Sequence, residues 1–339
     1  MCPCSQKTNL NFCSSLKKPK NFRDTLVVIG NGFDIWQGLP TTAQHFDRYF
    51  RRHQLEILKK LNIPPIEKRE GKKLTYGTAL DLIYGASTFE FEIYSDFWYE
   101  FEEALGNIED ERIIRFFGTD PSDIEDLRRN AKNAWRILKY TVSHWIQTVS
   151  IPNSALPLVF PPTCLFLTFN YTQTLQKRLH IDNRNIYHIH GCVQCPDSII
   201  FGHNRRPQHD FDVLRIFGGS FHAGYYLQEL LHKTDKKIAL QIKEYKKYLH
   251  NYHYLLREIR QIYIVGHSLG VIDMDYFRFL RKAIDPYAKW YISYFSEMDK
   301  KRAEKLMHHL KIHPKQYELY PSIEQCLQPF MQQTKVNEN

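Results

Sequence analysis

Residues that could perform chemistry follow several short apolar runs of the sequence. The first group is Gly30, Asn31, Gly32 and Asp34, which comes directly after the run Thr25–Ile29. A strand followed by a glycine turn and a helix start brings backbone N–H groups against a phosphate. The glycines also let a ligand approach the backbone closely. This first motif therefore predicts a phosphate cradle.

Three further polar motifs stand in the same position relative to an apolar run. They are Thr168–Thr172 with Asn170, His188–Gly191 with His190 and with His203 close behind, and Gly266–Gly270 with Ser268, followed by Asp273. Open α/β sheets bind ligands outside the carboxyl ends of their strands. The four motifs are therefore expected to meet in one crevice.

The elements that would position these residues alternate between β-rich and helical stretches, which predicts an α/β fold with a parallel, Rossmann-like sheet. The expected strands are Leu26–Ile29, Leu165–Thr168, Ile186–Ile189, Ile199–Phe201, Ile262–Val265 and Trp290–Tyr294. We expect a disordered leader over residues 1–22 and a single domain over 23–335, with helical insertions at about 41–160 and 205–260.

Two segments of these insertions have recognisable patterns. Apolar residues recur at helical spacing between Leu127 and Val149, which predicts a helix with one buried stripe. The acidic and aromatic segment Phe89–Leu105 could hold a metal ion through paired carboxylates, but a solvated helix face is the favoured interpretation.

Composition narrows the class of protein. The chain has 339 residues and a formal net charge of +9, which permits contact with nucleic acid or with an anionic ligand. Its seven cysteines do not suggest a disulfide framework, and no run approaches the ~20 apolar residues of a membrane helix. We expect a cytoplasmic protein with reduced thiols, no membrane contact and a homo-oligomeric assembly.

The motifs also carry a resemblance to known families. The set GNGFD, GLPT, FNYT, HIHG, GHN and GHSLG, the last followed by an aspartate and Tyr276-Phe277, resembles the bacterial abortive-infection family AbiH, which is implicated in phage resistance. More distantly, the glycine motif and its Gly38-Leu39-Pro40 resemble the sirtuin glycine signature. Phe169-Asn170-Tyr171, His190-Gly191 and Gly266–Leu269 are similar to the sirtuin segments at the nicotinamide ribose, the catalytic His-Gly and the adenosine site, in the same order.

This resemblance implies a phage-defence effector with NAD as its substrate, cleaved at the nicotinamide–ribose bond. Asn170 and His190 would be catalytic, the first holding a ribose hydroxyl or water and the second acting as general base. The remaining contacts to the nucleotide would come from Gly30, Asn31, Gly32, Asp34, His203, Gly266, Ser268 and Asp273. A phage-derived trigger or partner protein is expected to release the activity.

Two departures from sirtuins limit the resemblance. Asp34 stands where sirtuins carry a small hydroxyl residue, and a carboxylate repels a pyrophosphate unless it faces ribose hydroxyls or a cation. Only Cys192 and Cys195 form a Cys-x-x-Cys pair, so a zinc site would need His203 or His209 as well. We therefore expect no metal and no protein deacylation.

Three alternatives stay open. Gly266–Gly270 matches the nucleophile elbow of α/β-hydrolases, with Asp285 or Asp299 and one of His308, His309 and His313 completing a triad around Ser268. A metal-dependent nuclease could use Asp34, His188, His190, His203 and Asp273. A nucleotide-binding sensor would bind without turnover.

Overall fold

The computed structural model describes residues 23–63, 66–67, 73–74, 102, 124–154, 156–204 and 235–331. The predicted leader and most of the segment Phe89–Leu105 lie outside these residues. The chain divides into two compact units, one made of residues 1–40, 149–199 and 238–339, the other of residues 41–148 and 200–237. The prediction of a single domain with two insertions stays a prediction.

The first unit is built on a six-stranded, all-parallel sheet of order β5-β4-β1-β6-β7-β8. The strands are β1 (Thr25–Ile29), β4 (Cys164–Thr168), β5 (Ile186–His188), β6 (Gln261–Val265), β7 (Lys289–Ser293) and β8 (Tyr317–Tyr320). The chain leaves β1 toward β4 and β5, then crosses back to β6, β7 and β8. This order matches the 3-2-1-4-5-6 order of dinucleotide-binding folds, and it confirms the Rossmann-like α/β prediction.

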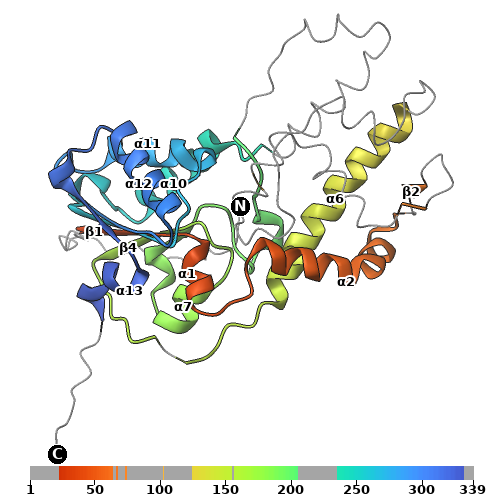
Figure 1. The fold of residues 1–339 in the computed structure, drawn as a ribbon, viewed down its shortest axis with the longest axis horizontal. Coiled ribbons are helices and arrows are strands. Elements are labelled where there is room, and N and C mark those ends of the chain that lie inside the picture. The colour runs from red at the N-terminus through yellow and green to blue at the C-terminus, as the bar shows by residue number, and fades with distance from the viewer. Residues whose placement is uncertain are drawn as a thin grey trace, which may run out of the picture. The chain divides into compact units, whose positions relative to one another are not determined.

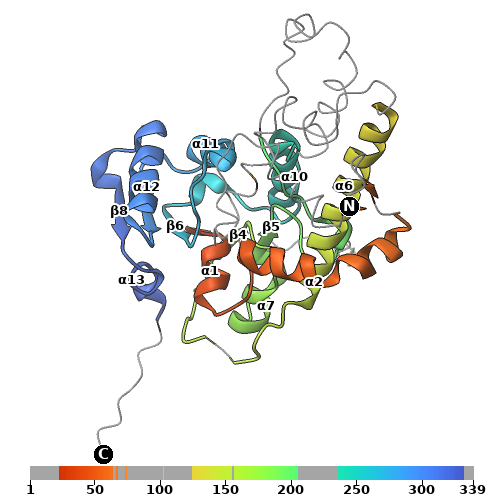
Figure 2. The same ribbon diagram turned by 45° about the vertical axis from the view of Figure 1, so that its right-hand side comes forward.

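Helices cover both faces of this sheet (Figures 1 and 2). On one face lie α10 (Ile238–Asn251), α11 (Met274–Ala283) and α12 (Glu297–His309), and on the other α1 (Asn31–Trp36), α7 (Thr174–Leu179) and α13 (Ile323–Cys326). Alternate residues of β1 enter the two cores: Leu26 and Val28 join the first, Val27 and Ile29 the second. Burial on both faces explains why the strands are continuous apolar runs.

The structure corrects two strand predictions. Ile199–Phe201 is wrong as a strand, because none of its three residues has strand structure and the chain passes from one compact unit to the other within this run. The sequence prediction also missed β8, whose residues Tyr-Glu-Leu-Tyr are half-buried or exposed at the edge of the sheet. An edge strand with a polar face has a weak apolar signal.

The second unit contains α2 (Ala43–Leu61), α6 (Ile124–Thr148) and the short hairpin of β2 (Ile66–Glu67) and β3 (Lys73–Leu74). The predicted apolar stripe packs α6 against α2, with the rings of Trp145 and Phe46 5.3 Å apart. Glu102 is buried rather than solvated, because its Oε2 lies 2.8 Å from the Nζ of buried Lys236 and its Oε1 accepts the N–H of Gly202.

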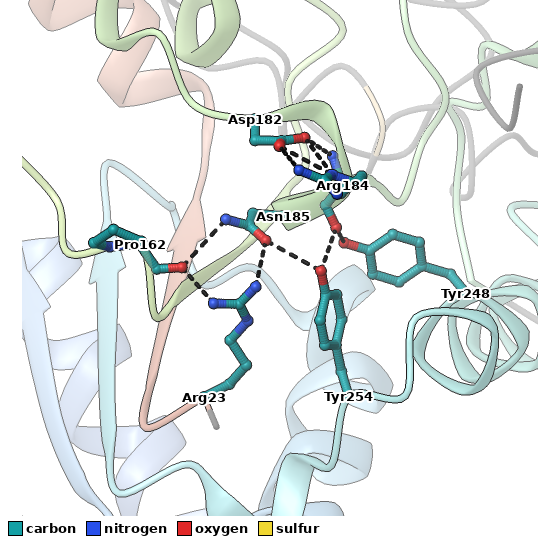
Figure 3. Close-up of polar contacts among 7 residues, drawn as sticks. All are labelled: Arg23, Pro162, Asp182, Arg184, Asn185, Tyr248 and Tyr254. Carbon is teal, nitrogen blue, oxygen red and sulfur yellow. Dashed lines mark hydrogen bonds and ion pairs between the residues drawn. The ribbon is translucent and has the colours of Figure 1, made fainter. Parts of the chain in front are cut away.

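A hydrogen-bond cluster anchors the first described residues of the chain beside β5 (Figure 3). Asn185 is its centre: its Oδ1 accepts from Arg23 at 3.0 Å and from the Tyr254 hydroxyl at 3.1 Å. The Asn185 Nδ2 donates to the carbonyl of Pro162, which also accepts from Arg23. The Tyr248 hydroxyl donates to the carbonyl of Arg184 at 2.6 Å.

Asn185→Ala is expected to lower the free energy of unfolding by about 1–2 kcal/mol, since Arg23 and Tyr254 each lose an acceptor. Chemical denaturation of both variants measures the change. The control is Asn183→Ala, which removes an exposed amide two residues away and should stay within about 0.5 kcal/mol of the unsubstituted protein. Equal stability of the two variants would contradict a structural role for the cluster.

Candidate active site

The four polar motifs of the first unit lie at the carboxyl edge of the sheet, as predicted. Gly30 follows β1, Phe169 follows β4, Ile189 follows β5 and Gly266 follows β6. The loops are tied together, because the N–H of Phe169 donates to the carbonyl of Ile29 and the N–H of Ile189 to that of Thr168. The strand order reverses between β1 and β6, which is where dinucleotides bind in such sheets.

The glycines after β1 and β6 bring two loops into direct contact. The N–H of Gly30 donates to Val265 and that of Gly32 to Gly266, at 3.0 and 2.7 Å. A Cβ added to Gly32 would lie 2.8 Å from the Gly266 carbonyl oxygen, and Gly266 itself has a φ of +61°. The N–H groups of Gly30 and Gly32 therefore form hydrogen bonds within the protein rather than pointing toward a ligand. A phosphate contact by this loop stays a prediction.

Asp34 is almost fully buried, at 1 % exposed, and it joins α1 to the segment after β4. Its Oδ2 accepts from the hydroxyl of Thr172 at 2.5 Å and its Oδ1 from that of Thr174 at 2.7 Å. Burial raises the pKa of Asp34 to about 6, against the opposing effect of these hydroxyls and of the Asn170 amide. The carboxylate thus faces threonine hydroxyls, and contact with a ribose stays a prediction.

The side-chain amide of Asn170, at this edge of the sheet, is buried and lacks hydrogen-bond partners. It is 6 % exposed, and neither its Oδ1 nor its Nδ2 forms a hydrogen bond of good geometry, although the amide lies near enough to Asp34 to lower that residue's pKa. Its backbone is fixed, because its N–H donates to the Oγ1 of Thr168 at 3.1 Å. Buried amides without partners are rare, and each one needs an explanation.

His188 supports the backbone of Asn170 from the neighbouring strand. Its Nδ1 lies 2.9 Å from the carbonyl oxygen of Asn170, which can only accept, so Nδ1 carries the proton. Its Nε2 lies 2.9 Å from the Gln176 Nε2 and accepts from it. Desolvation lowers the pKa of His188 to about 4, so the ring is neutral at physiological pH and both of its nitrogens are occupied.

His190 belongs to a cluster of rings around Phe169. The Nε2 of His190 lies 3.3 Å from the hydroxyl of Tyr276. The rings of His190, His267 and Tyr276 meet the Phe169 ring edge to face, at centroid distances of 5.1, 4.4 and 5.3 Å. Phe277 stacks on it in parallel. The cluster brings the second, third and fourth motifs together. The sequence analysis included Tyr276 and Phe277 in the last motif but gave neither a role in the site.

The loop after β6 holds His267, Ser268 and Asp273. The Nδ1 of His267 accepts the N–H of Leu269 at 3.0 Å, so the neutral ring carries its proton on Nε2, 3.8 Å from the Oδ2 of Asp273. Both side chains are buried, and Ser268 between them in sequence is partly exposed. Leu269 has a φ of +55°, an uncommon backbone conformation that often accompanies functional loops.

His203 belongs to the second compact unit. It is buried and pairs through a β-bridge with Asp235, and its carbonyl accepts the N–H of Lys236 at 2.9 Å. Its predicted contact with a nucleotide stays a prediction. Cys192 and Cys195 occupy one turn after His190, in which the N–H of Cys195 donates to the Cys192 carbonyl. Over the described part of the chain, no three His, Cys, Asp or Glu side chains form a group that could hold a metal ion.

The geometry contradicts the nucleophile-elbow interpretation. Ser268 stands beyond the carboxyl end of β6, whereas Asp285 and His313 precede β7 and β8, at the amino edge of the sheet. Asp299 caps α12 and pairs with Arg302 at 2.9 Å. The helix that should follow the serine directly begins only at Met274, after a turn.

Comparison with known proteins gives one match. The family model described as bacteriophage abortive infection AbiH matches residues 26–294, a span that runs from the second residue of β1 to just beyond β7 and contains all the residues predicted to contact NAD. No curated protein and no solved structure matches the chain. In the described residues, no helix is long and apolar enough to span a membrane.

Proposed function

Because the chain belongs to the bacteriophage abortive infection AbiH family, we propose that it is a phage-defence effector that hydrolyses the nicotinamide–ribose bond of NAD. The observation that carries this proposal is the buried, unpartnered amide of Asn170 at the carboxyl edge of a sheet with the strand order of dinucleotide-binding folds.

An amide that is buried without partners costs about 1–3 kcal/mol of stability. A chain keeps such a group where a ligand completes its hydrogen bonds, because stability is commonly sacrificed at functional sites. Asn170 offers one acceptor and two donors. A ribose diol, which both donates and accepts, fits this set.

His190 is the proposed general base. Its ring is held between Phe169 and the hydroxyl of Tyr276, and such packing keeps a catalytic imidazole in one orientation. An imidazole ordinarily titrates near neutral pH, which suits proton transfer under physiological conditions. His188, with both nitrogens engaged, supports Asn170 instead of taking a proton.

The reaction proceeds by cleavage of the C1′–N bond, whose electron pair leaves with nicotinamide. The ribose passes through an oxocarbenium-like state, as in glycoside hydrolysis. A water oxygen bonds to C1′, and the proton of that water passes to His190 and then to solvent. The products are nicotinamide, ADP-ribose and one proton. The formal charge of +9 favours the approach of an anionic dinucleotide.

The competing nuclease hypothesis requires Asp34 to bind a metal ion. Both oxygens of this carboxylate accept hydrogen bonds from threonine hydroxyls, so a metal ion would have to displace or share these contacts. These contacts favour a structural role for Asp34.

The test is incubation of the pure protein with NAD, ATP, RNA and DNA in parallel, with and without added divalent metal, with products identified by mass. Nicotinamide and ADP-ribose from the NAD arm support the proposal. If RNA or DNA is cleaved in a chelator-sensitive way while NAD stays intact, the nuclease hypothesis replaces this proposal. If NAD binds saturably and no product forms, the hypothesis of a nucleotide-binding sensor replaces this proposal.

Tyr276→Phe is expected to lower kcat for NAD about fivefold with little change in KM, since the His190 ring loses one hydrogen bond worth about 1 kcal/mol. The matched control is Tyr245→Phe, which removes another buried hydroxyl, one that has no hydrogen-bond partner. Steady-state kinetics should show full activity for the control. Equal kinetics of the two variants would contradict a role for Tyr276 in catalysis.

A further inference from the structure

A hollow lies at the edge of the same sheet that is opposite to the four polar motifs. It has a volume of about 390 Å³ and is lined by Arg260, Gln261, Asp285, Tyr287, Lys289 and Tyr291. Gln261 and Lys289 are the first residues of β6 and β7 and pair with each other in the sheet. Because the strands are parallel, the hollow opens at their amino ends, away from Asn170. Its volume falls within the range of small-molecule sites.

Two cations and one carboxylate, that of Asp285, border this hollow. Arg260 and Lys289 are exposed, and neither forms an ion pair with another described residue. Their backbones are fixed side by side, since the N–H of Lys289 donates to the carbonyl of Arg260 at 2.8 Å. Two neighbouring positive charges at a concave site attract an anion.

Two aromatic rings, those of Tyr287 and Tyr291, also line the hollow. The side chain of Tyr287 is 86 % exposed, an unusual position for a large ring. Tyr291 is half-buried and stacks on Tyr263, with ring centroids 4.6 Å apart. The exposed ring offers a face on which a planar group can stack.

Asp285 adds a hydrogen-bond acceptor. Its Oδ1 accepts the N–H of Tyr287 at 2.7 Å, which holds the loop before β7 in place. A carboxylate beside two cations selects a ligand that carries hydroxyl or amino donors as well as a negative charge. A phosphate, a planar ring and sugar hydroxyls together meet these three demands.

We propose that this hollow binds a nucleoside phosphate, as a second site separate from the carboxyl edge of the sheet. The phosphate contacts Arg260 and Lys289, the base stacks on Tyr287 and a donor of the ligand reaches Asp285. This proposal does not depend on whether the protein hydrolyses NAD.

Calorimetric titration of the full chain with AMP, adenosine and inorganic phosphate tests the proposal. AMP should bind more tightly than either fragment. Arg260→Gln and Lys289→Gln should each weaken AMP binding about fivefold, and Tyr287→Ala should weaken it by a similar factor. Lys305→Gln, which removes an exposed lysine of α12, is the matched control and should leave the affinity unchanged.

A short oligonucleotide with a 5′-phosphate distinguishes two sources of the ligand. If the oligonucleotide competes with AMP, the site binds the end of a nucleic-acid strand. If it does not compete, the site binds a free nucleotide. AMP binding that is insensitive to Lys289→Gln but lost in Asn170→Ala would overturn the proposal, because the ligand would then occupy the carboxyl edge. No AMP binding would also overturn it, whatever the protein does to NAD.

Discussion

Asn170→Ala is expected to lower the rate of NAD hydrolysis about 100-fold without lowering the free energy of unfolding. The loss of rate follows from removing a preorganised polar group that contacts the reacting ribose. The stability is expected to hold because the amide makes no hydrogen bond of good geometry that the substitution could break. Kinetics and chemical denaturation on the same preparations measure both effects.

Asn185→Ala is the matched control, since it removes the same side chain from the cluster in Figure 3, where both amide groups have partners. It should lose stability and keep its activity, which is the reverse of Asn170→Ala. A large loss of stability in Asn170→Ala would show that the amide has structural partners, and full activity would remove it from catalysis.

The unfolding free energy is expected to fall by about 3 kcal/mol between about pH 4 and pH 7 because of Asp34. Burial raises the pKa of this carboxyl group from 3.8 to about 6 in the folded chain. Across this interval the folded chain holds a proton that the unfolded chain has released, so stability decreases as pH rises and levels off above the folded pKa.

Asp34→Asn should remove this dependence, because the amide does not titrate and can still bond to Thr172 and Thr174. Denaturant unfolding at several pH values between 4 and 7.5 compares the two profiles. The control is Asp197→Asn, an exposed residue whose substitution should leave the slope as it is. Parallel profiles for Asp34→Asn and the unsubstituted chain would contradict the burial of a titrating Asp34.

Much of the carboxyl edge could be predicted from the sequence. Apolar β-branched runs such as Thr25–Ile29 indicate buried parallel strands, and the residues after such strands meet at one edge whatever the details of packing. The proximity of His190 and His267, which both contact the Phe169 ring, is consistent with this rule.

The features of the site that the sequence did not indicate are contacts between segments far apart in the chain. The phosphate-cradle prediction treated Gly30 and Gly32 as open to a ligand, whereas their N–H groups donate to the carbonyls of Val265, at the end of β6, and of Gly266, directly after it. The hydroxyl partners of Asp34 depend on how α7 sits beside α1, and no local pattern encodes that. His203 follows an apolar run like the other motifs, yet it belongs to a different compact unit.

The most direct test is incubation of the pure protein with NAD in water enriched in ¹⁸O, with products resolved by mass. Hydrolysis at C1′ predicts unlabelled nicotinamide and ADP-ribose that carries one ¹⁸O in its terminal ribose, with both products strongly reduced in Asn170→Ala. Label in a phosphate group, which marks cleavage of the pyrophosphate, or intact NAD after prolonged incubation would contradict the proposed activity.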